Sequence, residues 1–149
     1  MTDQATAPLC ALYARTSRAD PAGALQFRAM RRFIHGRGWR VYGEFVDARY
    51  PGAMDQLPAL DELLQAASEH RFDCVVVAQV HRFGCSLGDF HERLQRLEAD
   101  GVRFVAAAQH IDTAQLVHTS GAIPIRVGDL LLKVAGACSD LELSEGEGI

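Results

Sequence analysis

Short apolar runs alternate along the chain with segments in which apolar residues recur every three or four positions. The runs have the length and composition of buried strands and cover residues 9–14, 41–46, 72–78 and 102–108. Helical spacing occupies residues 23–36, 60–67 and 86–100, and a longer apolar segment follows residue 125. This order predicts right-handed βαβ units, and therefore an α/β domain whose mainly parallel sheet of roughly four to five strands has helices on both faces.

The helix signals are clearest in the last two helical segments. Ser86 and Asp89 form an S-x-x-D capping box, and Gly101 follows the helix that they begin. The last helix is expected over about Ile125 to Leu143, where Leu132 and Leu143 fall outside the main apolar stripe. That stripe comprises Val127, Leu130, Leu131, Val134, Cys138 and Leu141. One stripe can cover the sheet, so the additional apolar positions predict a second packing surface.

Two polar loops follow strands of the predicted sheet. Residues 15–18 come directly after the first strand, and residues 79–86 come after the third. Ligand sites in parallel sheets gather at the carboxyl ends of the strands. We therefore expect the first strand to be central, the two loops to adjoin, and the functional site to lie between them.

Composition and charge narrow the function classes. The 149 residues, 48% of them apolar, suffice for one domain with a buried core. A net charge of −4 gives no support for nucleic-acid binding from bulk charge. The apolar runs are too short to span a membrane, and the Cys and His residues lack the spacing of a zinc site or a disulfide framework. A reduced, cytoplasmic protein without a metal site is expected.

Ser17 stands between Arg15 and Arg18 in the first loop. Guanidinium groups match phosphate oxygens, and a hydroxyl can donate a hydrogen bond or attack phosphorus. The same residues are also typical of a solvated turn. Taken without the rest of the chain, they favour such a turn over a phosphate site.

The order of segments along the whole chain changes that balance. LYARTS (12–17) is followed by Gln26, and the later segments are VDARYPGAMDQLPALDELL (46–64), RFDCVVVAQVHRFGCSLGDF (71–90), GVRFVAAAQHIDT (101–113) and DLELSE (140–145). In this order and spacing they resemble the catalytic domain of the serine recombinases, the resolvase/invertase family. The resemblance implies a three-layer α/β/α resolvase-like domain over residues 1–143 with a long C-terminal helix. The sequence itself predicts an acidic tail at 144–149, and no DNA-binding domain is expected in these residues.

The resemblance also implies a chemistry. Ser17 matches the nucleophile that attacks a DNA phosphodiester and forms a 5′-phosphoserine, and Arg15 and Arg82 match arginines that stabilise the charge on phosphorus. Gln26 matches the glutamine of the first helix, and Glu142 matches the glutamate of the family's F-E-R motif. No metal or other cofactor is implied.

Several positions depart from the family pattern. Leu57, Cys85 and Leu143 stand where the family has arginines, and His81 replaces an aspartate. Leucine and cysteine cannot supply a cation, and removal of one electrostatic donor typically costs about 10²–10³ in rate. Arg18, Arg49 or a protonated His81 could compensate as substrate-phosphate-binding groups; alternatively, Ser17 and Arg15 hold a phosphate without attacking it.

Partners follow from the same resemblance. In the family the last helix forms the dimer interface, so a homodimer or higher oligomer built on residues 125–143 is expected, or a heterodimer with an intact recombinase. Duplex DNA is expected to bind weakly and without sequence preference, because the end of the chain is acidic. Either the sequence is a piece of a longer protein or the protein lacks sequence-specific DNA binding of its own.

Three functions therefore compete. The first is a DNA recombinase catalytic domain, attenuated by its lost arginines. The second is an inactive family member that regulates an active recombinase by association. The third is an unrelated phosphate- or nucleotide-binding module, which ranks last because the chain has neither a G-x-G-x-x-G nor a Walker loop.

Overall fold

The computed structural model describes residues 7–48, 57–84, 86–118, 120–121 and 123–147, with side chains up to residue 138. The larger elements are β1 (Leu9–Arg15), α1 (Ala24–Arg37), β2 (Arg40–Asp47), α2 (Pro58–Ser68), β3 (Cys74–Val77), α3 (Leu87–Ala99), β4 (Arg103–Ala106) and α4 (Val127–Glu147). The smaller ones are the 3-10 turns η2 (Val80–Arg82) and η3 (Ala107–Gln109) and the two-residue strands β5 (Ile111–Asp112), β6 (Leu116–Val117) and β7 (Ile125–Arg126).

The sheet has five strands in the order β2-β1-β3-β4-β5. Parallel pairing joins β1 to β2, β1 to β3 and β3 to β4, and the short β5 is antiparallel to β4. The α/β class and the mainly parallel sheet are therefore confirmed. The expectation that β1 is central is wrong, because β3 is the middle strand; β1 nevertheless has neighbours on both sides.

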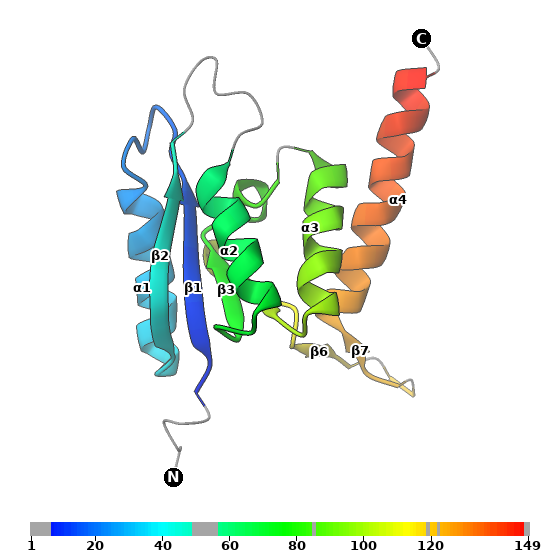
Figure 1. The fold of residues 1–149 in the computed structure, drawn as a ribbon. Helices are drawn as coiled ribbons and strands as arrows, with labels where there is room; N and C mark the ends of the chain where they lie inside the picture. Colours follow the sequence, from blue (N-terminus) through cyan, green and yellow to red (C-terminus); the bar gives the residue numbers. More distant parts are fainter. Residues whose placement is uncertain (1–6, 49–56, 85, 119, 122, 148–149) are drawn as a thin grey trace.

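Helices cover both faces of the sheet (Figure 1). The alternation along β1 sends Cys10, Leu12 and Ala14 into a core cluster with α1. Ala11 and Tyr13 point to the other face and join the cluster beneath α2 and α3. The helix α4 runs alongside α3, outside the sheet (Figure 1).

Two of the helix starts are fixed by side chains. The Ser86 hydroxyl accepts a hydrogen bond from the Asp89 N–H at 3.1 Å, so the predicted cap of α3 is confirmed. The start of α2 is held from a distant strand: Asp47, at the end of β2, accepts from the N–H groups of Ala59 (2.8 Å) and Leu60 (2.9 Å).

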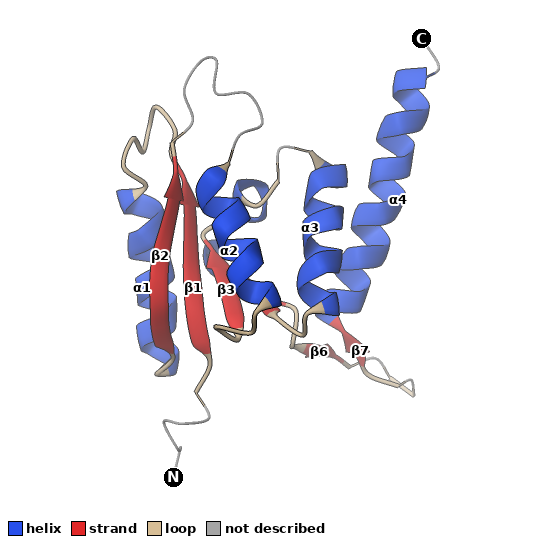
Figure 2. Cartoon of the chain, viewed as in Figure 1, coloured by secondary structure: helices blue, strands red, loops and turns tan. Residues whose placement is uncertain are grey.

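The last helix differs from its prediction at both ends. It begins at Val127, after the β6-β7 hairpin that residues 125–126 complete (Figure 2), and it runs to Glu147. Residues 144–147 are therefore helical and not a tail. Arg126 fixes the start of the helix to α3 by an ion pair with Glu98 at 2.7 Å.

The buried face of α4 also differs from the predicted stripe. Ala135 is buried, and Leu131 and Leu132 pack partly against the core beneath α3. Leu130 is 43% exposed and Val134 is 52% exposed. The prediction placed these two inside the stripe and Leu132 outside it because it assumed that α4 packs on the sheet; the helix packs on α3 instead. Within the described part of the chain, no helix is long and apolar enough to cross a membrane.

Asp47 stabilises more than the start of α2, because its carboxylate also accepts a hydrogen bond of 2.8 Å from the buried Tyr13 hydroxyl. We expect Asp47→Ala to lower the free energy of unfolding by about 2–4 kcal/mol, since it removes the α2 cap and leaves a buried hydroxyl unbonded. Tyr13→Phe should cost about 1–2 kcal/mol. Urea denaturation followed by circular dichroism measures both, with the exposed Glu62→Ala as the matched carboxylate control, expected within about 0.5 kcal/mol of the parent. Equal losses for Asp47→Ala and Glu62→Ala would contradict this account.

Candidate functional site

The loops that follow β1 and β3 meet, as predicted. The Arg15 side chain ends β1 and is only 3% exposed. Its Nη2 donates a hydrogen bond of 2.7 Å to the carbonyl oxygen of His81, in the turn after β3. This contact follows from the parallel pairing of β1 with β3, which brings both carboxyl ends to one edge of the sheet.

Ser17 lies two residues beyond β1 and is half-buried. Its hydroxyl oxygen accepts a hydrogen bond from the Asp20 N–H at 3.2 Å, and the backbones of Ser17 and Asp20 exchange two further bonds. These bonds close a tight loop over residues 17–20. Because the hydroxyl acts only as an acceptor in the Asp20 contact, its own proton stays available to a neighbouring acceptor or base.

Gln26, on α1, is buried behind this loop. Its Nε2 donates to the Arg15 carbonyl at 2.8 Å and to Asp20 Oδ2 at 3.2 Å, and its Oε1 accepts from the Arg15 N–H at 3.2 Å. Asp20 in turn accepts from the N–H groups of Leu25 and Gln26 at the start of α1. The Gln26 amide is thus occupied by the Arg15 backbone and by Asp20, and it does not face outward.

Arg82 ends the η2 turn and brings a second guanidinium group to this edge. Its Nε is buried and has no hydrogen-bond partner among the described residues. Burial of Asp20 acts to raise its pKa, but hydrogen bonds from Leu25 and Gln26 and the positive charge of Arg82 prevail and hold the pKa below its usual range. Arg82 therefore lies near Asp20, whose own N–H contacts Ser17. Two guanidinium groups beside a serine suit an anion with several oxygens.

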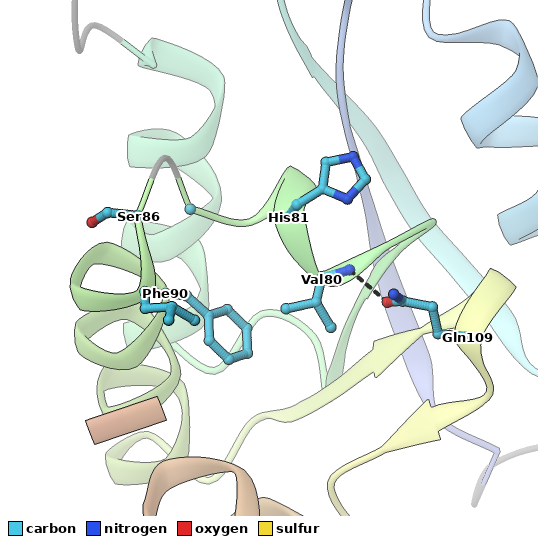
Figure 3. Close-up of a pocket in the computed structure, with 7 residues that line it drawn as sticks. Val80, His81, Ser86, Phe90 and Gln109 are labelled. Carbon is cyan, nitrogen blue, oxygen red and sulfur yellow. Dashed lines mark hydrogen bonds between the residues drawn. The ribbon is translucent and has the colours of Figure 1, made fainter. Parts of the chain in front are cut away.

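The His81 side chain is exposed. Arg82 is the next residue in the chain, and the His81 carbonyl accepts the hydrogen bond from Arg15. Desolvation, reinforced by the positive charges of Arg82 and Arg15, lowers the pKa of its imidazole below the ordinary value. Burial and the two neighbouring arginines thus disfavour the protonated form of this imidazole. In Figure 3 its ring points away from the neighbouring pocket.

That pocket has a volume of about 340 Å³ and lies between η2 and the start of α3. It is lined by Val80, His81, Gly84, Ser86, Leu87, Phe90 and Gln109. Figure 3 shows the side chains of Val80 and Phe90 facing each other across it, and the Val80 N–H donates to Gln109 Oε1 at 2.8 Å. Its lining is mainly apolar, so it does not itself provide the charges of an anion site.

The other positions that the sequence singled out make none of these contacts among the described residues. Arg18 is exposed on the loop after Ser17. Arg49 and Cys85 lie outside the described residues, as does the side chain of Glu142. Among the substituted positions, Leu57 is 8% exposed and belongs to the apolar core at the start of α2, so this side chain packs in place of an ion.

Residues that the sequence patterns left unassigned also shape the site. Asp20 and Asp47 each cap a helix from a loop or strand end, and Tyr13 joins Asp47 to β1. An aspartate at the end of a strand that leads into a Pro/Gly loop is a detectable signal, but its helix partner is not. Within the described residues, no group of three or more His, Cys, Asp or Glu side chains could hold a metal ion.

Comparisons with known proteins agree with this fold. The family described as "Resolvase, N terminal domain" matches residues 10–143. The N-terminal catalytic domain of TP901-1 integrase is similar in structure, with a TM-score of 0.71, 23% identity, and coverage of 91% of this chain and 96% of that one.

A resolvase family site-specific recombinase from Streptococcus pneumoniae has a TM-score of 0.74 at 19% identity, covering 93% of this chain and 89% of that one. At such identities the likeness to solved structures concerns the fold alone, and no curated protein matches the chain. The family match itself spans most of the sequence, and this chain therefore belongs to the resolvase family, through the N-terminal domain of that family.

Proposed function

We propose that this domain cleaves and rejoins DNA through a 5′-phosphoserine intermediate on Ser17. The observation that carries the proposal is that the Arg15–His81 hydrogen bond joins the loop of Ser17 to the loop of Arg82, whose Nε is buried and lacks a hydrogen-bond partner among the described residues. A buried donor of this kind is costly unless a ligand completes it. A phosphodiester has negatively charged oxygens that can accept a hydrogen bond from this donor.

The proposed step is a transesterification. Ser17 Oγ attacks the phosphorus, its proton leaves, and a new Oγ–P bond forms. The bond from phosphorus to the 3′ oxygen breaks, and that oxygen takes up a proton to become a 3′-hydroxyl. Arg15 and Arg82 stabilise the negative charge that grows on the phosphoryl oxygens. The reverse step, with a different 3′-hydroxyl, rejoins the strands.

We propose that this activity is attenuated. Leu57 packs in the core where the family pattern has an arginine, and the lowered pKa of His81 disfavours a protonated imidazole as a substitute. Arg18 is the remaining candidate on the described part of the first loop, and its exposed side chain has room to approach a bound phosphate. For Arg49, Cys85 and the side chain of Glu142, the proposal rests on the sequence alone.

A second candidate function is regulation of an active recombinase by association. It is favoured by Leu130 and Val134, which are exposed on α4 after the helix has packed against α3. Apolar side chains one turn apart on a helix form a short stripe that a second helix can cover. The same stripe serves a homodimer, so association and catalysis are compatible.

We expect Ser17→Ala to abolish covalent attachment to supercoiled DNA in a trapping assay, because no other oxygen replaces the nucleophile. Arg82→Met should slow adduct formation by about 10²–10³. Ser68→Ala and the exposed Arg71→Met are matched controls expected to retain parental rates. An adduct that persists in Ser17→Ala would exclude Ser17 as the nucleophile, and no adduct in the parent would favour the regulatory function.

We expect the domain to self-associate through α4. Leu130→Asp or Val134→Asp should shift the mass measured by light scattering at high micromolar concentration from dimer toward monomer, because a carboxylate would be buried without a partner. Leu25→Asp, at a more exposed leucine on α1, is the control that should leave the mass unchanged. A strict monomer in the parent would exclude a homodimer.

We expect His81 to titrate below its usual pKa in an NMR pH series, and Arg82→Met to raise that pKa toward the ordinary value. Because the folded state resists protonation of this imidazole, the unfolded state binds more protons below about pH 6.5, and the free energy of unfolding falls as the pH is lowered through that range. His81→Gln should remove this part of the pH dependence. A His81 pKa above its usual value would restore the protonated imidazole as a compensating cation.

A further inference from the structure

Arg93 is an arginine that neither the family pattern nor the proposed mechanism uses. It lies on α3 beside the residues that this helix buries, Phe90, Leu94 and Leu97, and its own side chain is half-buried. Its Nη1 donates a hydrogen bond of 3.0 Å to the carbonyl oxygen of Phe83. Phe83 is fully buried and directly follows Arg82.

This hydrogen bond fixes the end of the η2 turn. Phe83 caps the C-terminal end of η2, and its N–H donates to the Val80 carbonyl at 3.0 Å. The Phe83 N–H closes the Val80–Arg82 turn, and Arg93 binds the carbonyl oxygen of the same phenylalanine. The orientation of Arg82 thus depends on a group from a different helix. A guanidinium bond to a carbonyl is charge-assisted and stronger than a bond between neutral groups.

The charge of Arg93 also reaches the end of β1. Burial and the hydrogen bond to Asp47 raise the pKa of Tyr13, while the positive charges of Arg15 and Arg93 oppose that rise. Tyr13 shares an apolar cluster with Leu57 and Phe83. The charges of Arg93, on α3, and of Arg15, on β1, therefore act on the same buried tyrosine.

Packing alone does not account for an arginine here. A half-buried guanidinium is desolvated at a cost that a methionine or leucine of similar reach would avoid. Among the described residues, the Phe83 carbonyl is the hydrogen-bond acceptor of Arg93, so most of its five N–H groups remain for solvent or an anion.

We infer that Arg93 is a positioning residue that holds the Val80–Phe83 segment so that Arg82 meets the substrate phosphate, an inference that rests on the function proposed above. It acts through Arg82 and does not itself react. The bond from Arg93 to the Phe83 carbonyl holds the segment in place.

Three substitutions separate the hydrogen bond from the charge. Arg93→Met removes both, Arg93→Gln retains a donor without the charge, and Arg93→Lys retains a donor and the charge. For adduct formation on supercoiled DNA, we expect Arg93→Met to reduce the rate at saturating DNA by about 10- to 10²-fold, because a small displacement of Arg82 is amplified in the transition state. The DNA concentration at half-saturation should change little. Arg93→Lys should recover most of the rate and Arg93→Gln part of it, and the exposed Arg96→Met is the matched control on the same helix.

A second measurement does not depend on activity. The pKa of His81 is set in part by Arg82, so release of the turn in Arg93→Met should move the His81 pKa toward its ordinary value in an NMR titration, with no change in Arg96→Met. If the parent forms no adduct, this titration still decides whether Arg93 holds the turn, which separates failure of the inference from failure of the proposed function.

Several results would overturn the inference. An unchanged His81 pKa in Arg93→Met would show that the turn is held without Arg93. A rise in the half-saturating DNA concentration with an unchanged maximal rate would make Arg93 a direct DNA contact instead. A rate loss that follows the loss of thermal stability equally in the Met, Gln and Lys variants would leave Arg93 a structural residue only.

Discussion

The hydrogen bond from the Arg15 guanidinium to the His81 carbonyl is the contact on which the rest of the site depends. It joins two loops that are 66 residues apart in the chain, and it exists because β1 and β3 are parallel neighbours whose carboxyl ends coincide. It also gives a cation that is 3% exposed a hydrogen-bond acceptor inside the fold. Ser17 follows Arg15 by two residues on one of the joined loops, and Arg82 directly follows His81 on the other.

Two aspartates extend this arrangement to the helices. Asp20 accepts N–H groups from the first turn of α1, and Asp47 does the same for α2. Both helix starts therefore lie at the same edge of the sheet as the site, with the positive ends of their dipoles toward it. The caps, the loops and the two guanidinium groups form one connected set, so a change that loosens a cap is also expected to move the site.

Local patterns were sufficient to predict the strands β1 to β4 and the helices α1 to α3, because alternation and helical spacing are properties of short segments. The face on which α4 packs was not predictable in the same way, since Leu130 and Leu132 are equally apolar and only the position of α3 decides which is covered. For the site, the adjacency of Arg15 and Arg82 followed from strand order. The part of Gln26 in holding the loop required the three-dimensional contacts.

Leu57 and Arg93 show a similar limit in predicting the charges of the site from the sequence. A motif counts arginines by their place along the chain, whereas a phosphate responds to charges by their distance in space. Leu57 removes a cation from the start of α2 and gains apolar contacts with the cluster that contains Tyr13. The charge of Arg93 acts on that same tyrosine from α3. Under the proposed function, the number of arginines missing from the family pattern is therefore an incomplete measure of the positive charge near Tyr13, and catalysis would depend on where the remaining guanidinium groups are held.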